Sequence, residues 1–151
     1  ISWGYFPILK TAILNYMHEK TVFEKIIAGE IPCYKVYEDD SVLAFLSKSQ
    51  RTKGHTLVVP KIHSRNILDI TEEDLLKIMS VVRRLSQHIY TGLGATGLKI
   101  QQNNESQGGQ EVFHTHFHII PRYEHDTFTT HAEVPMTHDD LVALSKEIYL
   151  K

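Results

Sequence analysis

The stretch Val112-Phe113-His114-Thr115-His116-Phe117-His118-Ile119-Ile120 places a histidine at every second position near its centre. Side chains of a β-strand alternate between its two faces, so the stretch predicts a strand with His114, His116 and His118 in one row. Pro121 follows and, because proline lacks a backbone N–H, it is expected to end the strand. Three imidazoles on one face of a strand form a candidate functional site.

Apolar periodicity and turn residues predict the other elements around this strand. The polar segment 38–41 favours a hairpin, Thr71 and Asp74 resemble a capping box, and Pro60 is expected to stop a strand. The expected order is a helix over 22–28, strands over 34–38, 42–46 and 55–59, a long helix from 71 to about 90, strands over 98–103 and 112–120, and a last helix over 137–150. This order predicts an α+β fold with a mainly antiparallel five-stranded sheet, a long helix and a C-terminal helix.

Length and composition predict one domain. The chain has 151 residues, of which 42% are hydrophobic and 23% charged, which suits a single core and is too short for two domains. Residues 21–151 are expected to form this domain. Residues 1–20 leave two alternatives open: a leader from an expression vector with Met17 as the natural start, or a native arm that packs on the body or on a partner subunit.

Charge and cysteine usage exclude several classes of partner. The net charge of −2 gives no basic field, so neither nucleic acid nor a membrane surface is expected as a partner. Cys33 is the only cysteine, which excludes an intrachain disulfide and suits a reducing cytosol. No apolar run approaches the roughly 18 residues of a membrane span, and no export signal is evident. A cytoplasmic location is therefore expected.

The residues alone leave the chemistry of the histidine row open. Imidazole can ligate a metal, shuttle protons or act as a nucleophile, and a buried row could also be structural if each ring finds a partner. A zinc site would lack cysteine ligands, and the sequence places no acidic ligand beside the row. The nucleophilic hypothesis explains why three rings are needed, because one attacks phosphorus while the others orient it or bind phosphoryl oxygens. The preceding loop, residues 106–110, contains two glycines that allow backbone amides to approach an anion.

The sequence over residues 109–122, GQEVFHTHFHIIPR, resembles the histidine-triad (HIT) family, whose motif alternates histidine with apolar residues. The resemblance extends through 23–32, 36–40 and 53–63, and covers about residues 21–123. It implies a nucleotide hydrolase or transferase that acts at the α-phosphorus of nucleoside phosphoramidates or dinucleoside polyphosphates. It also implies a purine nucleotide or nucleotide conjugate as ligand and a homodimer as the assembly. No cofactor is expected to be required, although a divalent metal ion could accompany polyphosphate substrates.

The resemblance implies a role for each candidate site residue. His116 would attack phosphorus and form a nucleotidyl-imidazole intermediate that water then cleaves, which divides one difficult displacement into two easier steps. His114 would orient His116, while His118 and His55 would hydrogen-bond the phosphoryl oxygens. The remaining nucleotide-binding residues would be Asn103 near the phosphate or leaving group, Gly109, Gln110, Glu111 and Val112 in the loop, Phe23, Ile26 and Phe45 as walls of the base pocket, and Ser47 and Lys48 beyond them.

Three departures from the family pattern affect these expectations. Ser47 stands where an acidic residue usually binds the ribose hydroxyls, so weaker ribose recognition is expected. Glu111 replaces Ser or Thr, and its carboxylate would repel an anionic leaving group and favour an amine. Thr21 and Glu24 replace the Cys-x-x-Cys pair with which bacterial relatives bind structural zinc, so no such zinc is expected. A nucleotide-binding regulatory module with little turnover is the alternative hypothesis, and a metal-dependent hydrolase is the third.

Overall fold

The computed structural model describes residues 19–126 and 133–151, so most of the segment 1–20, with its two alternatives of leader or native arm, lies outside the described residues. Five antiparallel strands form one sheet in the order β1-β2-β3-β5-β4, which confirms the expected α+β class. The elements are α2 (Val22–Ile27), β1 (Lys35–Glu38), β2 (Val42–Leu46), β3 (Thr56–Pro60), α3 (Glu72–Gly92), β4 (Gly97–Gln101), the 3₁₀ turn η1 (Ser106–Gly108), β5 (Phe117–Arg122) and α4 (His138–Glu147).

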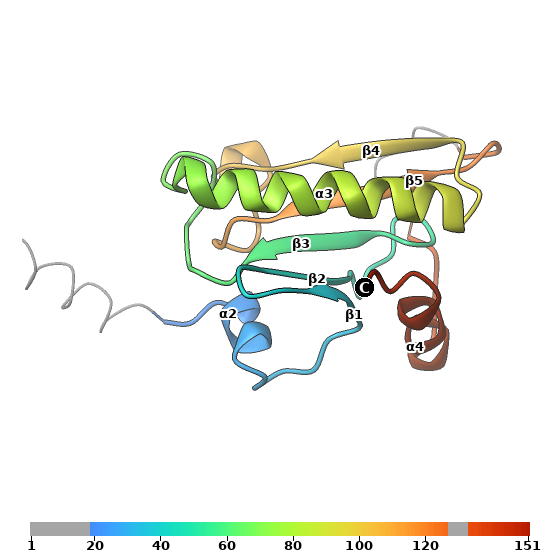
Figure 1. Ribbon diagram of the computed structural model, residues 1–151, viewed down its shortest axis with the longest axis horizontal. Coiled ribbons are helices and arrows are strands. Elements are labelled where there is room, and N and C mark those ends of the chain that lie inside the picture. The colour runs from blue at the N-terminus through green and yellow to red at the C-terminus, as the bar shows by residue number, and fades with distance from the viewer. Residues whose placement is uncertain (1–18, 127–132) are drawn as a thin grey trace, which may run out of the picture.

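The helices are shared between the two faces of the sheet (Figure 1). Alternate residues of β2, among them Ala44 and Leu46, join a large core with α3 and α4. The other residues of β2, Leu43 and Phe45, pack with Phe23 of α2 on the opposite face. All five residues of β2 are buried because both faces of the strand are covered. The cluster beneath α2 contains strand residues of β2 and β3 only, so the same face of β5 and β4 is left for the candidate site.

Helix α3 begins and ends close to the predicted residues. The Thr71 side chain accepts a hydrogen bond from the backbone N–H of Asp74, which supplies the expected N-terminal cap. Its sheet-facing residues are fully or almost fully buried, and each contributes about 1.5–3 kcal/mol of transfer free energy: Ile78, Val81, Val82, Leu85 and Ile89. Among the described helices, none has both the length and the apolar character needed to cross a membrane.

The predicted strand at the histidine run is wrong in its boundaries. Strand β5 begins at Phe117 rather than Val112, so His118 is the only one of the three histidines that lies in it. The preceding segment binds the chain before α3 instead of a sheet neighbour. The backbone N–H of Thr115 donates to the carbonyl of Ser64 at 2.8 Å, and the two hydroxyls lie 2.7 Å apart.

The two prolines differ in how they fit the expectation that they end strands. Pro60 is the last residue of β3, as expected, whereas Pro121 lies within β5 and pairs with Leu98, which corrects the expectation for that strand. The pairing of β3 with β5 stops before either proline, so neither missing N–H removes a ladder bond between these strands. The carbonyl of Pro121 accepts from the Thr52 hydroxyl, and that of Pro60 accepts from the His114 ring. In each case the bond lies on the side of the proline that has no paired strand.

Candidate active site

Three imidazoles meet on the same face of the sheet as α2, on the part of that face that α2 does not cover. His118 projects from β5 on the face shared with Leu57 of β3, because the two residues are direct partners in the register. His55, immediately before β3, lies with its Nε2 2.9 Å from Nδ1 of His118. The ring of His116 lies 5.0 Å from that of His118, centroid to centroid. The cluster therefore consists of His116, His118 and His55 rather than of the three alternating histidines.

His114 has a different position and a supporting contact. It is fully buried, does not line the cavity beside His116, and donates from Nε2 to the carbonyl of Pro60 at 2.8 Å. His114 does not lie in one row with His116 and His118, because strand β5 starts only after His116. Its own backbone carbonyl lies 2.7 Å from Nδ1 of His116. A carbonyl can only accept, so Nδ1 of His116 carries the proton and Nε2 keeps the lone pair of a nucleophile.

Burial keeps the clustered histidines neutral. It lowers the pKa of His116 below the usual 6.5 and that of His55 to about 4. The pKa of His118 falls to about 3, chiefly because the ring is buried. Positive charge on His116 and His55, and the cationic side chains of Arg51 and Lys99, lower it further. A neutral imidazole is the form that can attack an electrophile.

These pKa shifts predict that acid destabilises the fold. In the unfolded chain His55 and His118 take up protons near pH 6.5, whereas in the folded protein they do so only near pH 4 and pH 3. The unfolded state therefore binds more protons in this window, and the free energy of unfolding falls as the pH decreases from about 6.5 to 4. The His55 shift alone corresponds to about 3 kcal/mol. Urea denaturation at pH 7.5, 6, 5 and 4.5 should show this decline, with a shallower slope in His118→Gln; equal slopes would contradict the assignment.

A cavity of about 320 Å³ opens beside His116 and His118. Its walls toward α2 and β2 are apolar, and Phe23 packs edge-on against the His116 ring at 5.0 Å between centroids. An apolar cleft with a few convergent polar groups is the usual form of a small-molecule site. Of the predicted nucleotide-binding residues, those that line it are Phe23, Ile26, Phe45, Ser47, Lys48, Asn103, Gly109, Glu111 and Val112.

The side chain of Gln110 lies outside this cavity and stabilises the loop instead. It is 4% exposed, donates to the carbonyl of Arg65 at 2.6 Å and accepts from the backbone N–H of Glu105 at 2.8 Å. At the cavity rim, the Asn103 amide donates to the carbonyl of Gly109 at 3.1 Å. Gly109 has a φ of +81°, a conformation that other residues adopt only with strain. Asn103 and Gly109 thus fix the shape of the loop at the cavity rim.

Comparison with known proteins gives the family. A model of the HIT domain matches residues 28–125. The chain is also 50% identical over 105 residues to Protein hit of Bacillus subtilis, an alignment that covers 70% of this chain and 72% of that protein. The chain belongs to the HIT family. This confirms the resemblance drawn from the histidine run and its flanking segments.

Two further relatives extend the comparison for this HIT protein. The adenosine 5'-monophosphoramidase hnt1 of Schizosaccharomyces pombe is 34% identical over 132 residues, covering 86% of this chain and 96% of that protein. The crystal structure of a Hit-like protein from Bartonella henselae with an unknown ligand superimposes with a TM-score of 0.81 at 38% identity, covering 87% and 96% of the two chains. The family thus includes a protein named as a nucleoside monophosphoramidase, and the present chain shares the fold of a solved Hit-like protein.

A second cluster of possible ligand atoms in this HIT protein consists of residues that do not line the cavity. Oxygen or nitrogen atoms of Glu24, His63 and His114 all fall within 4.8 Å of one another. The expectation of no zinc rested on the missing cysteines, yet Glu24 provides a carboxylate at one of those two positions. One carboxylate and two imidazoles are ligands that zinc accepts, and the His114 bond to Pro60 leaves Nδ1 of His114 with a lone pair. An ion held there would be structural, since none of the three residues lines the cavity.

Sequence reasoning missed residues that support the HIT site from a distance. Gln50 is 1% exposed and holds the turn before β3, donating to the carbonyls of Ser47 and His55 and accepting from the N–H groups of Gly54 and His55. Arg51, the next residue in the chain, lines the cavity itself. Both stand in a polar turn without periodicity, so no local pattern distinguishes them from solvated residues.

Proposed function

We propose that this HIT protein hydrolyses or transfers nucleotides at the α-phosphorus, through a covalent bond between phosphorus and Nε2 of His116. The observation that carries the proposal is the hydrogen bond from Nδ1 of His116 to the carbonyl of His114, at 2.7 Å. It directs the lone pair of Nε2 away from the backbone in a ring that lines the cavity. The substrates proposed are nucleoside phosphoramidates and dinucleoside polyphosphates.

The reaction proceeds in two displacements. Nε2 of His116 attacks the α-phosphorus, the bond to the leaving amine or phosphate breaks, and its electron pair leaves with that group; an amine takes up a proton from solvent as it departs. Water then attacks the same phosphorus and gives up a proton to solvent, the phosphorus–nitrogen bond breaks, and His116 is regenerated with release of the nucleoside monophosphate. Each step needs donors for the phosphoryl oxygens, whose negative charge grows in the transition state.

The His55–His118 pair is suited to supply such a donor. Nδ1 of His55 lies 3.1 Å from the carbonyl of Ser49 and 3.4 Å from the N–H of Arg51. The shorter contact favours a proton on this Nδ1, with Nδ1 of His118 donating to Nε2 of His55. A shift of one proton within each ring reverses the bond between them and places an N–H on Nε2 of His118, while the Arg51 N–H then donates to His55. A phosphoryl anion beside His118 favours this second arrangement.

A panel of substrates tests this proposal. Wild-type protein is expected to release AMP from adenosine phosphoramidate and from diadenosine tetraphosphate. Glu111 lines the same cavity as His116, and its negative charge raises the pKa of His116 against the larger effect of burial, which supports a role for this carboxylate at the leaving group. Glu111→Ser is expected to raise kcat/KM for the tetraphosphate relative to the phosphoramidate by roughly 3- to 10-fold. Tight AMP binding without turnover of either substrate would support the binding-module alternative instead.

Catalysis is expected to survive chelation, because imidazole attack on phosphorus needs no metal ion. Dialysis against EDTA should change kcat/KM for adenosine phosphoramidate by less than about twofold. Metal analysis of the same sample reports any ion lost from Glu24, His63 and His114, and the melting temperature reports its structural effect. Loss of phosphoramidase activity that added zinc restores, with an unchanged melting temperature, would support the metal-dependent hydrolase.

We further propose that this HIT protein is a homodimer. Strand β4 ends the sheet, and Ile100 on it is 43% exposed. The outer side of α3 carries the exposed apolar residues Leu76, Met79 and Tyr90. An unpaired sheet edge beside an apolar helix surface favours association with a second copy. Light scattering after size-exclusion chromatography should give twice the chain mass of 17.4 kDa, whereas a monomer at assay concentration would contradict the proposal.

A further inference from the structure

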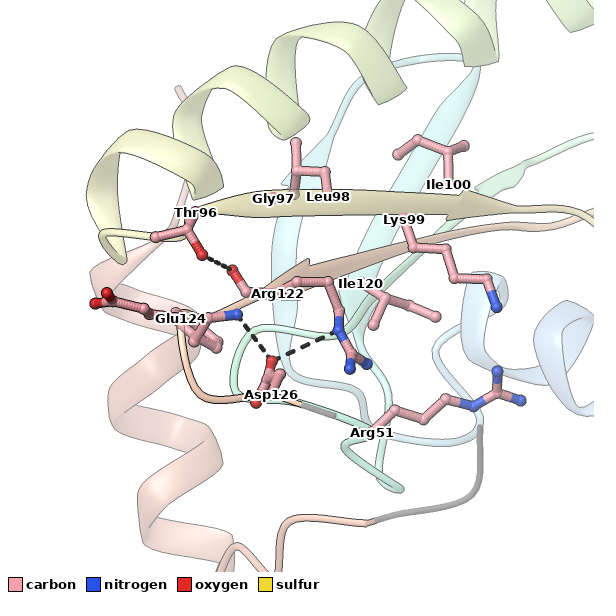
Figure 2. A pocket seen from close by; sticks show the side chains of 11 residues that line it. Arg51, Thr96, Gly97, Leu98, Lys99, Ile100, Ile120, Arg122, Glu124 and Asp126 are labelled. Carbon is pink, nitrogen blue, oxygen red and sulfur yellow. Dashed lines mark hydrogen bonds and ion pairs between the residues drawn. The ribbon is translucent and has the colours of Figure 1, made fainter. Parts of the chain in front are cut away.

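A second and larger cavity, of about 750 Å³, lies on the same face of the sheet as the histidine cluster (Figure 2). Direct partners in an antiparallel register share a face. His118 pairs with Gln101, and two residues further along, Ile120 pairs with Lys99. Arg122 is paired next, with Gly97. The cavity therefore continues the row that begins at His118, along β5 and β4 and away from α2.

Three cationic side chains line this cavity: Arg51, Lys99 and Arg122. Asp126 partly compensates Arg122, with its Oδ2 3.6 Å from Nε, and also accepts from the backbone N–H of Tyr123 at 2.8 Å. Glu124 is the second carboxylate of the lining, and in Figure 2 its side chain points away from Arg51 and Lys99. Within residues 19–126 and 133–151, no ion pair involves Arg51 or Lys99. The lining thus carries excess positive charge.

The two cavities share one lining residue, and charges from the second cavity act on histidines of the cluster. Arg51 lines each of them. The charges of Arg51 and Lys99 contribute, after burial and the neighbouring histidines, to the low pKa of His118. Arg51 also contributes to the low pKa of His55. Positive charge from the second cavity therefore acts on the place where the phosphoryl group would bind.

We infer that the second cavity binds the phosphate chain of a nucleotide substrate beyond the attacked phosphorus, through Arg51, Lys99 and Arg122. The inference rests on the proposed function, because that function places the nucleoside against Phe23 and Phe45 and the phosphorus at His116. The base walls belong to α2 and β2, so the opposite direction across the sheet runs over β5 to β4, where the second cavity lies.

The chemistry of the leaving group accounts for the cations. When His116 bonds to the α-phosphorus, the phosphorus–oxygen bond to the next phosphate breaks and the electron pair remains on the departing oxygen. The departing phosphate chain thus gains negative charge, which Arg51 and Lys99 stabilise more in the transition state than in the bound substrate. An amine leaving group takes up a proton as it departs, so it gains no such charge, and it does not extend far enough to use the cavity. The negative charge of Glu111, on the loop side of the first cavity, would instead repel a departing phosphate chain.

Lys99→Gln and Arg51→Gln test the inference with two substrates that differ in the leaving group. We expect Lys99→Gln to lower kcat/KM for diadenosine tetraphosphate roughly tenfold, and the double variant to lower it further. For adenosine phosphoramidate, Lys99→Gln should remain within about twofold of wild type. Lys146→Gln, an exposed lysine on α4, is the matched control for charge and should affect neither substrate. An equal loss on both substrates, or no loss on the tetraphosphate, would overturn the inference.

Calorimetric titration with inorganic tripolyphosphate provides a readout that does not depend on turnover. Wild-type protein and Lys146→Gln should bind it equally, and Lys99→Gln should bind it several-fold more weakly. Turnover of the phosphoramidate together with Lys99-independent tripolyphosphate binding would leave the proposed function intact and exclude the second site. Lys99-dependent binding without turnover of any substrate would retain the anion site and reject the proposed hydrolysis.

Discussion

His116→Ala is expected to lower kcat for adenosine phosphoramidate by about 10⁴-fold or more, because it removes the atom that bonds to phosphorus. Neither His118 nor His55 can take its place. Nε2 of His55 is engaged in a hydrogen bond of 2.9 Å with Nδ1 of His118, and His55 does not line the cavity. Of the two histidines that line it, His116 is the one whose Nδ1 donates to a backbone carbonyl. The measurement is AMP release under saturating substrate.

Two controls separate this chemical effect from damage to the fold. His125→Ala removes an exposed histidine and should retain wild-type turnover. Calorimetry with AMP should show that His116→Ala still binds nucleotide within about tenfold of wild type, since the apolar walls remain. Retention of more than a few per cent of wild-type turnover in His116→Ala would exclude the covalent mechanism.

Gln50→Leu is expected to lower the free energy of unfolding on the order of 3 kcal/mol. The Gln50 oxygen accepts from the backbone N–H groups of Gly54 and His55, at 2.9 and 3.0 Å. Leucine removes both bonds, together with the two that the Gln50 amide donates to carbonyls; the N–H of His55 keeps the Thr52 carbonyl at 3.1 Å, whereas that of Gly54 loses its partner. Each buried donor that loses its partner costs about 1–3 kcal/mol. Urea denaturation monitored by circular dichroism measures the loss.

The same variant should also affect the histidine cluster, because Gln50 positions the residue that contacts His118. The Gln50 amide donates to the carbonyl of His55 at 2.8 Å, and its loss allows that backbone to move. A lower kcat for the phosphoramidate, with nearly unchanged AMP affinity, would show this positioning role. Gln87→Leu, at an exposed site on α3, is the matched control and should change stability by less than about 0.5 kcal/mol. Equal stability of the two variants would contradict the assignment to Gln50.

The elements that sequence predicted well are those whose signals are local. The capping residue Thr71 and the three- and four-residue spacing that follows it predicted α3, and its burial pattern agrees. The continuous apolar run that follows the polar turn over residues 38–41 predicted β2 with its observed bounds. A helix cap or a strand face is defined by residues close in the chain, so composition and spacing carry enough information.

The histidine run shows where local signals fail. Alternation from Val112 to Ile120 is compatible with a strand, but whether a strand forms depends on a neighbour to pair with. The segment before Phe117 binds Ser64 instead, 51 residues away in sequence. His114 is consequently separated from the cavity and contacts Pro60 and His63. The same reason hides the basic cavity, since Lys99 and Arg122 come together only through the register of β4 and β5.

The most direct test of the account is capture of the nucleotidyl group in a single turnover. Protein in excess over adenosine phosphoramidate is quenched within milliseconds in alkaline denaturant, which preserves the phosphorus–nitrogen bond, and is then digested for mass spectrometry. The account predicts an adenylyl group on the peptide that contains His116, with fragment ions that place it on that ring, and none in His116→Ala. AMP formation without any transient adduct, or an adduct on a different residue, would contradict it.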